Sequence, residues 1–280
     1  MKEITAAKIN QKLVQELTKI GYIAPRSMVQ QFQMARKNEK NEIARDLLTQ
    51  LMKNIKIAKE KNFPLCQDTG LVVFWVRIGK NVSLRHLNLN KIVNDAVQEA
   101  FQKNNYRSSI VQDPLHRVNT RTNTPALIHY ELTEGDSLEM RFLLKGGGCE
   151  NMSTLKMLDP SSGIQGIRDF VLETVQKSGG KACPPLYVGV GIGGNFESVA
   201  WLAKKSLFRL PKEINTSQFW LEEEDYLFKE INNLGLGPLG LGGKTTSFKV
   251  NIEVLPCHIA SLPVAVNLEC HAHRLGHIKI

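Results

Sequence analysis

Three of the five cysteines stand where a thiolate could face a cavity, each at an expected junction between a regular element and a loop. They are Cys66, Cys183 and Cys270, in Cys-Gln-Asp-Thr-Gly at 66–70, Ala-Cys-Pro-Pro at 182–185 and Asn-Leu-Glu-Cys-His at 267–271. A four-iron cluster normally takes four thiolates, so a protein that supplies three leaves one iron open as a Lewis acid for substrate oxygens. Spacing alone also allows three core cysteines, because the chain has no Cys-x-x-Cys pair and buried free cysteine is common.

Two further groups could act beside such a metal centre. Asp68 follows the first cysteine by two residues, and its carboxylate could protonate an oxygen as hydroxide leaves. The alternative is that Asp68 caps the turn at Thr69-Gly70. Three glycines follow Lys145, and backbone without side chains can form an anion-binding nest. The alternative there is a flexible turn after a strand.

Hydrophobic periodicity predicts the elements that would position these groups. Helices are expected up to about residue 60, one near Ile9, Leu13 and Leu17. The buried face of a later one is expected to consist of Ile43, Leu47, Leu48, Leu51, Met52 and Ile55. The remaining pattern predicts strands at 71–76, 186–192 and 248–254, a β-hairpin at 126–132 and 138–144, and helices at 92–101, 164–175, 195–207 and 216–233.

The predicted fold class is mixed α/β (α+β). A helical portion, residues 1–62, is expected to pack on a sheet-containing remainder, residues 63–280, with the three cysteines on converging loops. Together these portions are expected to form one catalytic-type domain, residues 1–280.

Composition excludes several classes of protein. The 280 residues are 42% hydrophobic and 22% charged, as in globular proteins. No apolar stretch approaches the roughly 20 residues of a membrane helix, and the start of the chain lacks a signal peptide, so a cytoplasmic protein is expected. The sparse cysteines make disulfides improbable.

Three other functions compete with a catalytic cluster. The formal charge of +9 could indicate a nucleic-acid-binding module, although Lys and Arg are interleaved with Asp and Glu and aromatics make up only 7%. Glycines at 189, 191 and 194 match a dinucleotide fingerprint with Glu213 as the ribose-binding acid, but they come late in the chain. Cys257-His258 and Cys-His-Ala-His at 270–273 offer ligands for zinc.

The motifs, in their order, resemble the alpha subunit of the class I iron–sulfur fumarate hydratase and L-tartrate dehydratase family along nearly the whole chain. The matching segments are 66–70, Asn-Thr-Pro-Ala at 123–126, Lys-Gly-Gly-Gly-Cys-Glu-Asn at 145–151, 182–185, Gly-Ile-Gly-Gly at 191–194 and the stretch that ends at Cys270.

The resemblance implies a 4Fe-4S cluster held by Cys66, Cys183 and Cys270, with one iron not ligated by protein. It assigns the hydroxyl proton to Asp68, and substrate binding to Gln67 and Arg107. The anion-binding nest adds Lys145, Gly146 and Gly147 as candidate substrate-binding residues. An arginine suits a carboxylate because its guanidinium grips both oxygens, although a lone arginine is more often a solvated surface residue. Cys149, where relatives often carry serine, and Cys257 are then non-ligands that pack in the core or beside the ligands.

The implied reaction is the reversible hydration of fumarate to L-malate, a step of the TCA cycle. Dehydration of L-tartrate to oxaloacetate and hydration of a methylfumarate such as mesaconate are the alternatives. Asn-Thr-Arg at 119–121 departs from the Asn-Thr-Gly of many fumarases, which leaves the substrate open. Single-chain relatives continue well beyond the last cluster cysteine, whereas ten residues follow it here. A separate beta subunit that completes the active site, in an α2β2 assembly, is therefore expected.

We predict that replacing Cys66, Cys183 or Cys270 by serine abolishes cluster loading, because each is one of the three thiolates that the resemblance implies for the cluster. Cys149→Ser and Cys257→Ser should largely spare it. The brown absorbance of the anaerobically reconstituted chain measures loading. Equal loss across all five variants would contradict the ligand assignment.

Overall fold

The computed structural model describes residues 4–280, and the chain divides into two compact units. The first unit contains the chain up to Pro25, Asn54–Gly147 and Arg274–Ile280, and the second contains Arg26–Lys53 and Gly148–His273. Each unit has its own four-stranded sheet with helices packed on it, so the predicted α+β class is confirmed. No helix among the described residues has the length and apolarity that spanning a bilayer requires.

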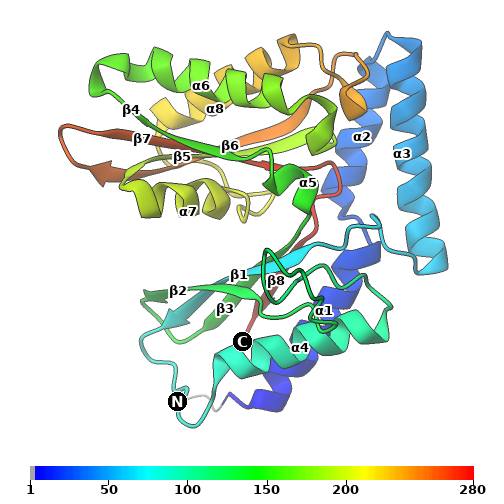
Figure 1. Cartoon of the computed structure of the whole chain (residues 1–280), viewed down its shortest axis with the longest axis vertical. Helices are drawn as coiled ribbons and strands as arrows, with labels where there is room; N and C mark the ends of the chain where they lie inside the picture. Colours follow the sequence, from blue (N-terminus) through cyan, green and yellow to red (C-terminus); the bar gives the residue numbers. More distant parts are fainter. Residues whose placement is uncertain (1–3) are drawn as a thin grey trace. The chain divides into compact units, whose positions relative to one another are not determined.

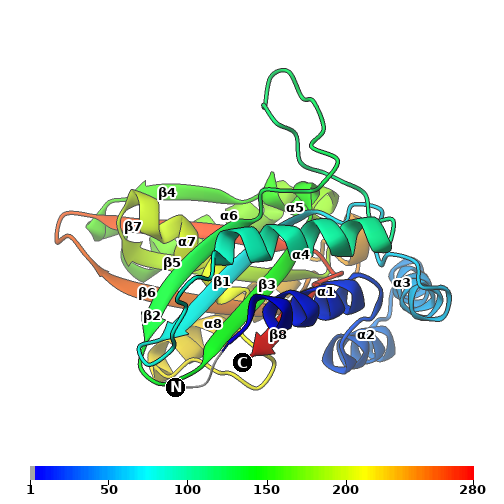
Figure 2. The ribbon, with the colours of Figure 1, turned by 90° about the horizontal axis from the view of Figure 1, so that it is seen from below.

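The sheet of the first unit has the order β2-β1-β3-β8. Its strands are β1 (Leu71–Gly79), β2 (Leu127–Thr133), β3 (Leu138–Lys145) and β8 (Leu275–Lys279). β1 runs parallel to β2 and antiparallel to β3, and β3 runs antiparallel to β8. Helices α1 (Ala6–Tyr22) and α4 (Leu89–Lys103) lie side by side on one face (Figures 1 and 2).

Alternation along the strands builds the core of the first unit. Val72, Phe74 and Val76 point to the helical face, as do Met140 and Phe142 of β3, and all are buried because successive strand side chains face opposite sides. The predicted stripe of α1 is buried as well, and its Thr5 side chain accepts the N-terminal Lys8 N–H at 3.3 Å.

The predicted hairpin at 126–144 is wrong, because β1 lies between β2 and β3. The turn between them closes over the end of β1 instead, where Lys80 N–H donates to Thr133 O at 2.8 Å and Asn81 N–H to Gly135 O at 3.0 Å. β3 is buried at all eight positions, as a central strand must be. Sequence proximity favoured a hairpin, but this apolar strand needed a neighbour on each side.

The sheet of the second unit has the order β4-β7-β5-β6. Its strands are β4 (Thr154–Leu158), β5 (Leu186–Gly194), β6 (Ser247–Cys257) and β7 (Leu262–Glu269). Helix α7 (Phe196–Ser206) covers one face, and α6 (Gly163–Ser178) and α8 (Gln218–Asn233) cover the other (Figure 1). Short helices complete the chain: α5 (Gly147–Glu150) and 3₁₀ turns at Pro160–Ser162, Gly179–Ala182 and Pro238–Gly240.

Helix α2 (Arg26–Asn38) belongs to the second unit, where Phe32 packs edge-on against Phe248 at 4.9 Å between ring centroids. Helix α3 (Glu42–Lys61) forms where a helix was expected, but most of its predicted buried face is only half-buried. Of the six apolar residues only Leu48 is buried, and Ile43 is 63% exposed. The small Ala44 and Ala58 are buried instead, so the contact stripe is narrower than the apolar stripe.

The glycines of the supposed dinucleotide fingerprint lie inside β5 and serve helix packing. A Cβ on Gly189 would stand 2.2 Å from Ala203 O, and one on Gly191 would stand 2.4 Å from Val199 O, both in α7. Glu213 uses its carboxylate to accept Leu210 N–H at 2.8 Å in its own turn. The fingerprint normally follows a strand and opens a helix, so this motif brings α7 close to the sheet rather than binding a nucleotide.

Gly189→Ala and Gly191→Ala should each lower the free energy of unfolding by about 3 kcal/mol, the upper range for overpacking, because the added methyl meets backbone of α7. Urea denaturation of the full chain measures this. The control is Gly135→Ala, which has open space but a φ of +101° and should cost only about 1 kcal/mol. Similar costs at all three sites would contradict the close-packing explanation.

Candidate functional site

Strand register gathers the motif segments of the first unit at one edge of its sheet. Leu71, the first residue of β1, pairs with Lys145, the last of β3, so the 66–70 loop and the glycine turn leave the sheet together. β8 runs antiparallel to β3 and begins just after Arg274. The Asn-Thr-Pro-Ala segment precedes β2, which is parallel to β1. The register alone therefore places four segments, distant in sequence, next to one another.

Asp68 joins the first loop to the glycine turn. Its Oδ1 accepts Gly70 N–H at 3.0 Å, with Ser109 Oγ at 3.4 Å, while its Oδ2 accepts Gly147 N–H at 2.8 Å. The carboxylate thus caps its own turn and also holds a second segment. Asp68 remains partly exposed beside a half-buried Cys66 and an exposed Gln67.

Glycines allow the chain segments to approach one another closely at this turn. A Cβ on Gly70, whose φ is +77°, would stand 2.4 Å from Lys145 O, and one on Gly146 would stand 3.3 Å from Asp68 Oδ2. Gly147 is an exposed residue, and its N–H donates to the carboxylate. Lys145 itself is fully buried, so it does not present a solvent-facing ammonium.

The Arg107 segment lies against the same loop through its backbone. The buried Thr69 hydroxyl donates to Arg107 O at 2.7 Å, whereas the Arg107 side chain is exposed. Below it, the fully buried Asn123 accepts Ser109 N–H at 2.7 Å and donates to Gly70 O at 3.1 Å. Sequence reasoning quoted Asn123 only as part of a motif and missed this role.

Sequence reasoning also missed Arg274, the largest fully buried side chain. Its Nη1 donates to Asp68 O at 2.9 Å. Its Nε and Nη2 are buried and have no hydrogen-bond partner among the described residues, and Nη2 is 3.9 Å from the Cβ position of Gly146. A charged residue at the start of an apolar strand, four positions after Cys270, was the available signal.

Register gathers the cysteine segments of the second unit in the same way. Cys183 precedes β5, and Cys270 follows β7, which runs antiparallel to it with Tyr187 opposite Glu269. The two loops are joined, because His271 N–H donates to Cys183 O at 3.3 Å and His271 Nδ1 lies 3.0 Å from the same oxygen. Cys183 is exposed and adopts the left-handed conformation, with φ of 55°.

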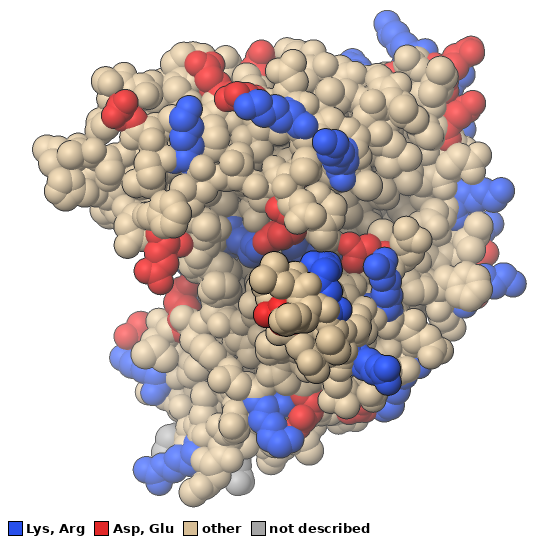
Figure 3. Space-filling model, viewed as in Figure 1, with Lys and Arg blue, Asp and Glu red and all other residues tan. Residues whose placement is uncertain are grey.

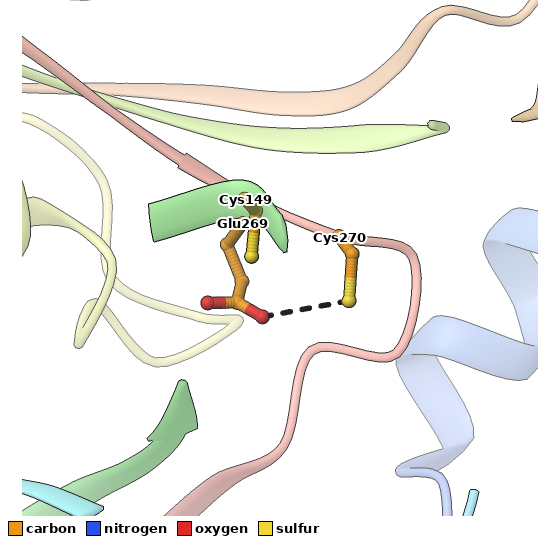
Figure 4. A group of neighbouring side chains, drawn as sticks. All are labelled: Cys149, Glu269 and Cys270. Atoms are coloured by element: carbon orange, nitrogen blue, oxygen red, sulfur yellow. Dashed lines mark hydrogen bonds between the residues drawn. The ribbon is translucent and has the colours of Figure 1, made fainter. Parts of the chain in front are cut away.

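Cys149 lies beside Cys270 in this unit (Figure 4). The Sγ atoms of both cysteines and a carboxylate oxygen of Glu269 lie within 4.8 Å of one another, and all three residues are buried. Cys270 Sγ is 3.7 Å from Glu269 Oε1. Burial raises the pKa of the neighbouring Tyr187, and the Cys270 thiol and Glu269 carboxylate raise it further.

Comparisons with known proteins support the family resemblance of the sequence. The model of the fumarate hydratase (Fumerase) family matches residues 10–279. The chain is 39% identical over 273 residues to a putative L(+)-tartrate dehydratase subunit alpha of Methanocaldococcus jannaschii, covering 95% of both chains. It is 32% identical over 260 residues to the L(+)-tartrate dehydratase subunit alpha of Escherichia coli, covering 91% of this chain and 85% of the relative.

This chain belongs to the fumarate hydratase family. It is a hydro-lyase of the fumarate hydratase and tartrate dehydratase alpha type. The chemistry of the predicted ligands fits the iron–sulfur cluster for which the family is known: Cys66, Cys183 and Cys270 form no disulfide, and thiolates are the ligands that such clusters take.

A strand separates the two groups of ligands of the competing zinc site, Cys257-His258 and residues 270–273. Cys257 and His258 lie at the turn before β7, whose eight residues span about 26 Å before Cys270. Cys257 is exposed and its Sγ donates to Ser261 O at 3.3 Å. The prediction of core packing is therefore wrong for Cys257, whereas Cys149 is buried.

The distribution of charge bears on the nucleic-acid-binding alternative. On the face shown in Figure 3, Lys and Arg are scattered among Asp and Glu rather than gathered in a stripe.

The buried Asn123 predicts a large stability effect. Asn123→Ala leaves the Ser109 N–H and the Gly70 carbonyl without their partner and should cost about 2–6 kcal/mol, at about 1–3 kcal/mol for each buried group. Asn119→Ala is the matched control, since exposed Asn119 also makes two side-chain bonds, to Ser108 O and Arg121 N. It should cost less than about 1 kcal/mol. Equal shifts in urea denaturation would show that Asn123 does not anchor the loop.

Proposed function

We propose that this chain is the cluster-carrying alpha subunit of an enzyme that hydrates fumarate to L-malate reversibly. The Asp68 carboxylate, bonded to Gly147 N–H at 2.8 Å, carries the proposal. This bond joins the loop that carries Cys66 and Asp68 to the glycine turn, which supports a role for Asp68 in proton transfer beside a turn that binds an anion. Dehydration of L-tartrate to oxaloacetate is the second candidate, favoured by the names of the relatives that match nearly the whole chain.

Cys66, Cys183 and Cys270 would hold the 4Fe-4S cluster with one iron not ligated by protein. When bound, it supplies a Lewis acid for substrate oxygens. The bond between the Cys183 and Cys270 loops supports this ligand set in the second unit. Cys66 joins the set through the resemblance of its motif, Cys-Gln-Asp-Thr-Gly at 66–70.

Asp68 would move the proton of the hydroxyl group. Its Oδ2 accepts one N–H at 2.8 Å, and a carboxylate oxygen has lone pairs for a further donor. A substrate hydroxyl can therefore bond to Asp68 without displacing the glycine turn. In dehydration the carboxyl group gives a proton to the departing oxygen, and in hydration the carboxylate takes it from water.

The groups around Asp68 would hold one substrate carboxylate. Gly146 and Gly147 offer backbone close to the ligand because neither has a side chain. Arg107 has an exposed side chain, while its backbone carbonyl accepts a hydrogen bond from the Thr69 hydroxyl. The exposed Gln67 precedes Asp68 in the sequence. Buried Arg274 adds a positive charge beneath the turn, and Lys145 positions the segment from within the sheet.

We propose that a separate beta subunit completes the enzyme as α2β2. The relatives are named as alpha subunits, which implies a partner chain. Removing water from malate or tartrate also needs a base for the carbon-bound proton. We assign that base to the beta subunit, because Asp68 is already committed to the oxygen side of the reaction.

The test is turnover by the reconstituted chain with and without the candidate beta subunit. We expect turnover only in the pair, faster on fumarate than on L-tartrate, and loss of turnover when the cluster is removed. Faster L-tartrate dehydration would establish the second candidate. Full turnover by the isolated chain would refute the two-subunit proposal.

Asp68→Asn provides the matched variant. It is isosteric and can still accept Gly147 N–H through its amide oxygen, although its amide nitrogen then faces Gly70 N–H, and it cannot exchange a proton. We expect kcat of the pair to fall by about 10²–10⁴-fold, as general acid–base groups contribute, with cluster absorbance unchanged. Normal kcat would remove Asp68 from the reaction.

A further inference from the structure

We propose that Cys149, Glu269 and Cys270 form a mononuclear site for a thiophilic divalent cation, Zn²⁺ first, which the chain uses when it carries no cluster. Their ligand atoms lie within 4.8 Å of one another (Figure 4). This site is distinct from the proposed cluster ligands except for Cys270, which cannot serve both at once. Occupancy by the cation should therefore exclude the cluster.

The three ligands are held by a rigid scaffold. Glu269 is the last residue of β7, Cys270 follows it, and Cys149 lies in α5 before β4. The Ser153 hydroxyl donates to Cys149 O at 3.1 Å and accepts Leu268 N–H at 3.1 Å, which locks α5 onto the end of β7. Such support from outside the ligand set is what a preorganised metal site requires.

The distances suit a tetrahedral ion. With Zn–S bonds near 2.3 Å, two thiolates on one ion stand about 3.8 Å apart. Cys270 Sγ and Glu269 Oε1 are already 3.7 Å apart, and no pair in the group exceeds 4.8 Å. A side-chain movement of about 1 Å therefore closes the site.

The donor chemistry selects the ion. Two thiolates and one carboxylate favour Zn²⁺ or Fe²⁺ over Mg²⁺ or Ca²⁺, which prefer oxygen ligands. Binding displaces the thiol protons to solvent and involves no oxidation or reduction. With three protein ligands, the fourth tetrahedral position is left for water. Burial of all three residues excludes competing solvent from the remaining contacts.

The experiment uses Co²⁺ as a visible probe on the full chain, freed of cluster with a chelator under anaerobic, reducing conditions. We expect one Co²⁺ per chain, with absorbance from sulfur-to-cobalt charge transfer that Zn²⁺ abolishes by competition. Cys149→Ser should weaken binding at least tenfold and reduce that absorbance. Glu269→Gln should weaken binding while keeping the sulfur-to-cobalt band.

The controls separate this site from the cluster site. Cys257→Ser removes an exposed cysteine, and Cys66→Ser and Cys183→Ser remove proposed cluster ligands; all three should bind Co²⁺ as the unaltered chain does. Unchanged affinity in Cys149→Ser would overturn the proposal, and so would equal weakening by Cys66→Ser or Cys183→Ser. Because Glu269 is buried and its variant could unfold, isosteric Cys149→Ser decides the result, with thermal melting to verify folding.

Cluster reconstitution gives an independent readout. Zn²⁺ bound beforehand should block cluster loading in the unaltered chain and block it far less in Cys149→Ser. If Cys149→Ser loads cluster normally but has lost Co²⁺ binding, both proposals hold. If it has lost neither, the mononuclear site fails while the cluster assignment stands.

Discussion

Strand register is the constraint on which the candidate site depends. In each unit the strands that carry motif residues begin or end at one edge of a sheet. The reason is that the start of one strand lies beside the end of its antiparallel neighbour. Leu71 opposite Lys145 sets this edge in the first unit, and Tyr187 opposite Glu269 sets it in the second. A slip of one residue in the strand register would turn Phe74 and its neighbours away from the core. Burial of the apolar strand faces therefore also fixes the positions of the candidate site residues at the strand ends.

Buried backbone N–H and C=O groups at that edge need hydrogen-bond partners, and a few side chains supply them. Asn123 and Thr69 are fully buried and bond to backbone that no strand pairs. Gly70 occupies a left-handed conformation against Lys145 O, where a Cβ has no room. The Cys-Gln-Asp-Thr-Gly motif is therefore a structural requirement, since Thr and Gly hold the loop that carries Cys66 and Asp68.

Elements with strong periodicity could be predicted from sequence, and pairings between distant segments could not. The stripe of Ile9, Leu13 and Leu17 predicted α1, and alternation in Phe248 to Val254 predicted β6. The insertion of β1 between β2 and β3 left no local signal, because the turn at Gly135 suits a hairpin equally well. Motif resemblance pointed to Asp68 and the glycine turn, which a hydrogen bond joins in the structure. It gave no indication that Cys149 meets Cys270, or that Arg274 holds Asp68 O, because both contacts join segments more than 100 positions apart.

Arg274 shows how the fold and the proposed chemistry constrain each other. A guanidinium taken out of water loses hydration that hydrogen bonds must replace, yet only Nη1 has a partner among the described residues. A packed apolar side chain would cost the fold less at this position. The charge instead lies beneath Gly146 and behind the Asp68 carbonyl, where the proposed substrate brings a carboxylate. Arg274 can therefore still bind an anion through the groups that the fold leaves without a hydrogen bond. This supports a dicarboxylate as the substrate class at this sheet edge.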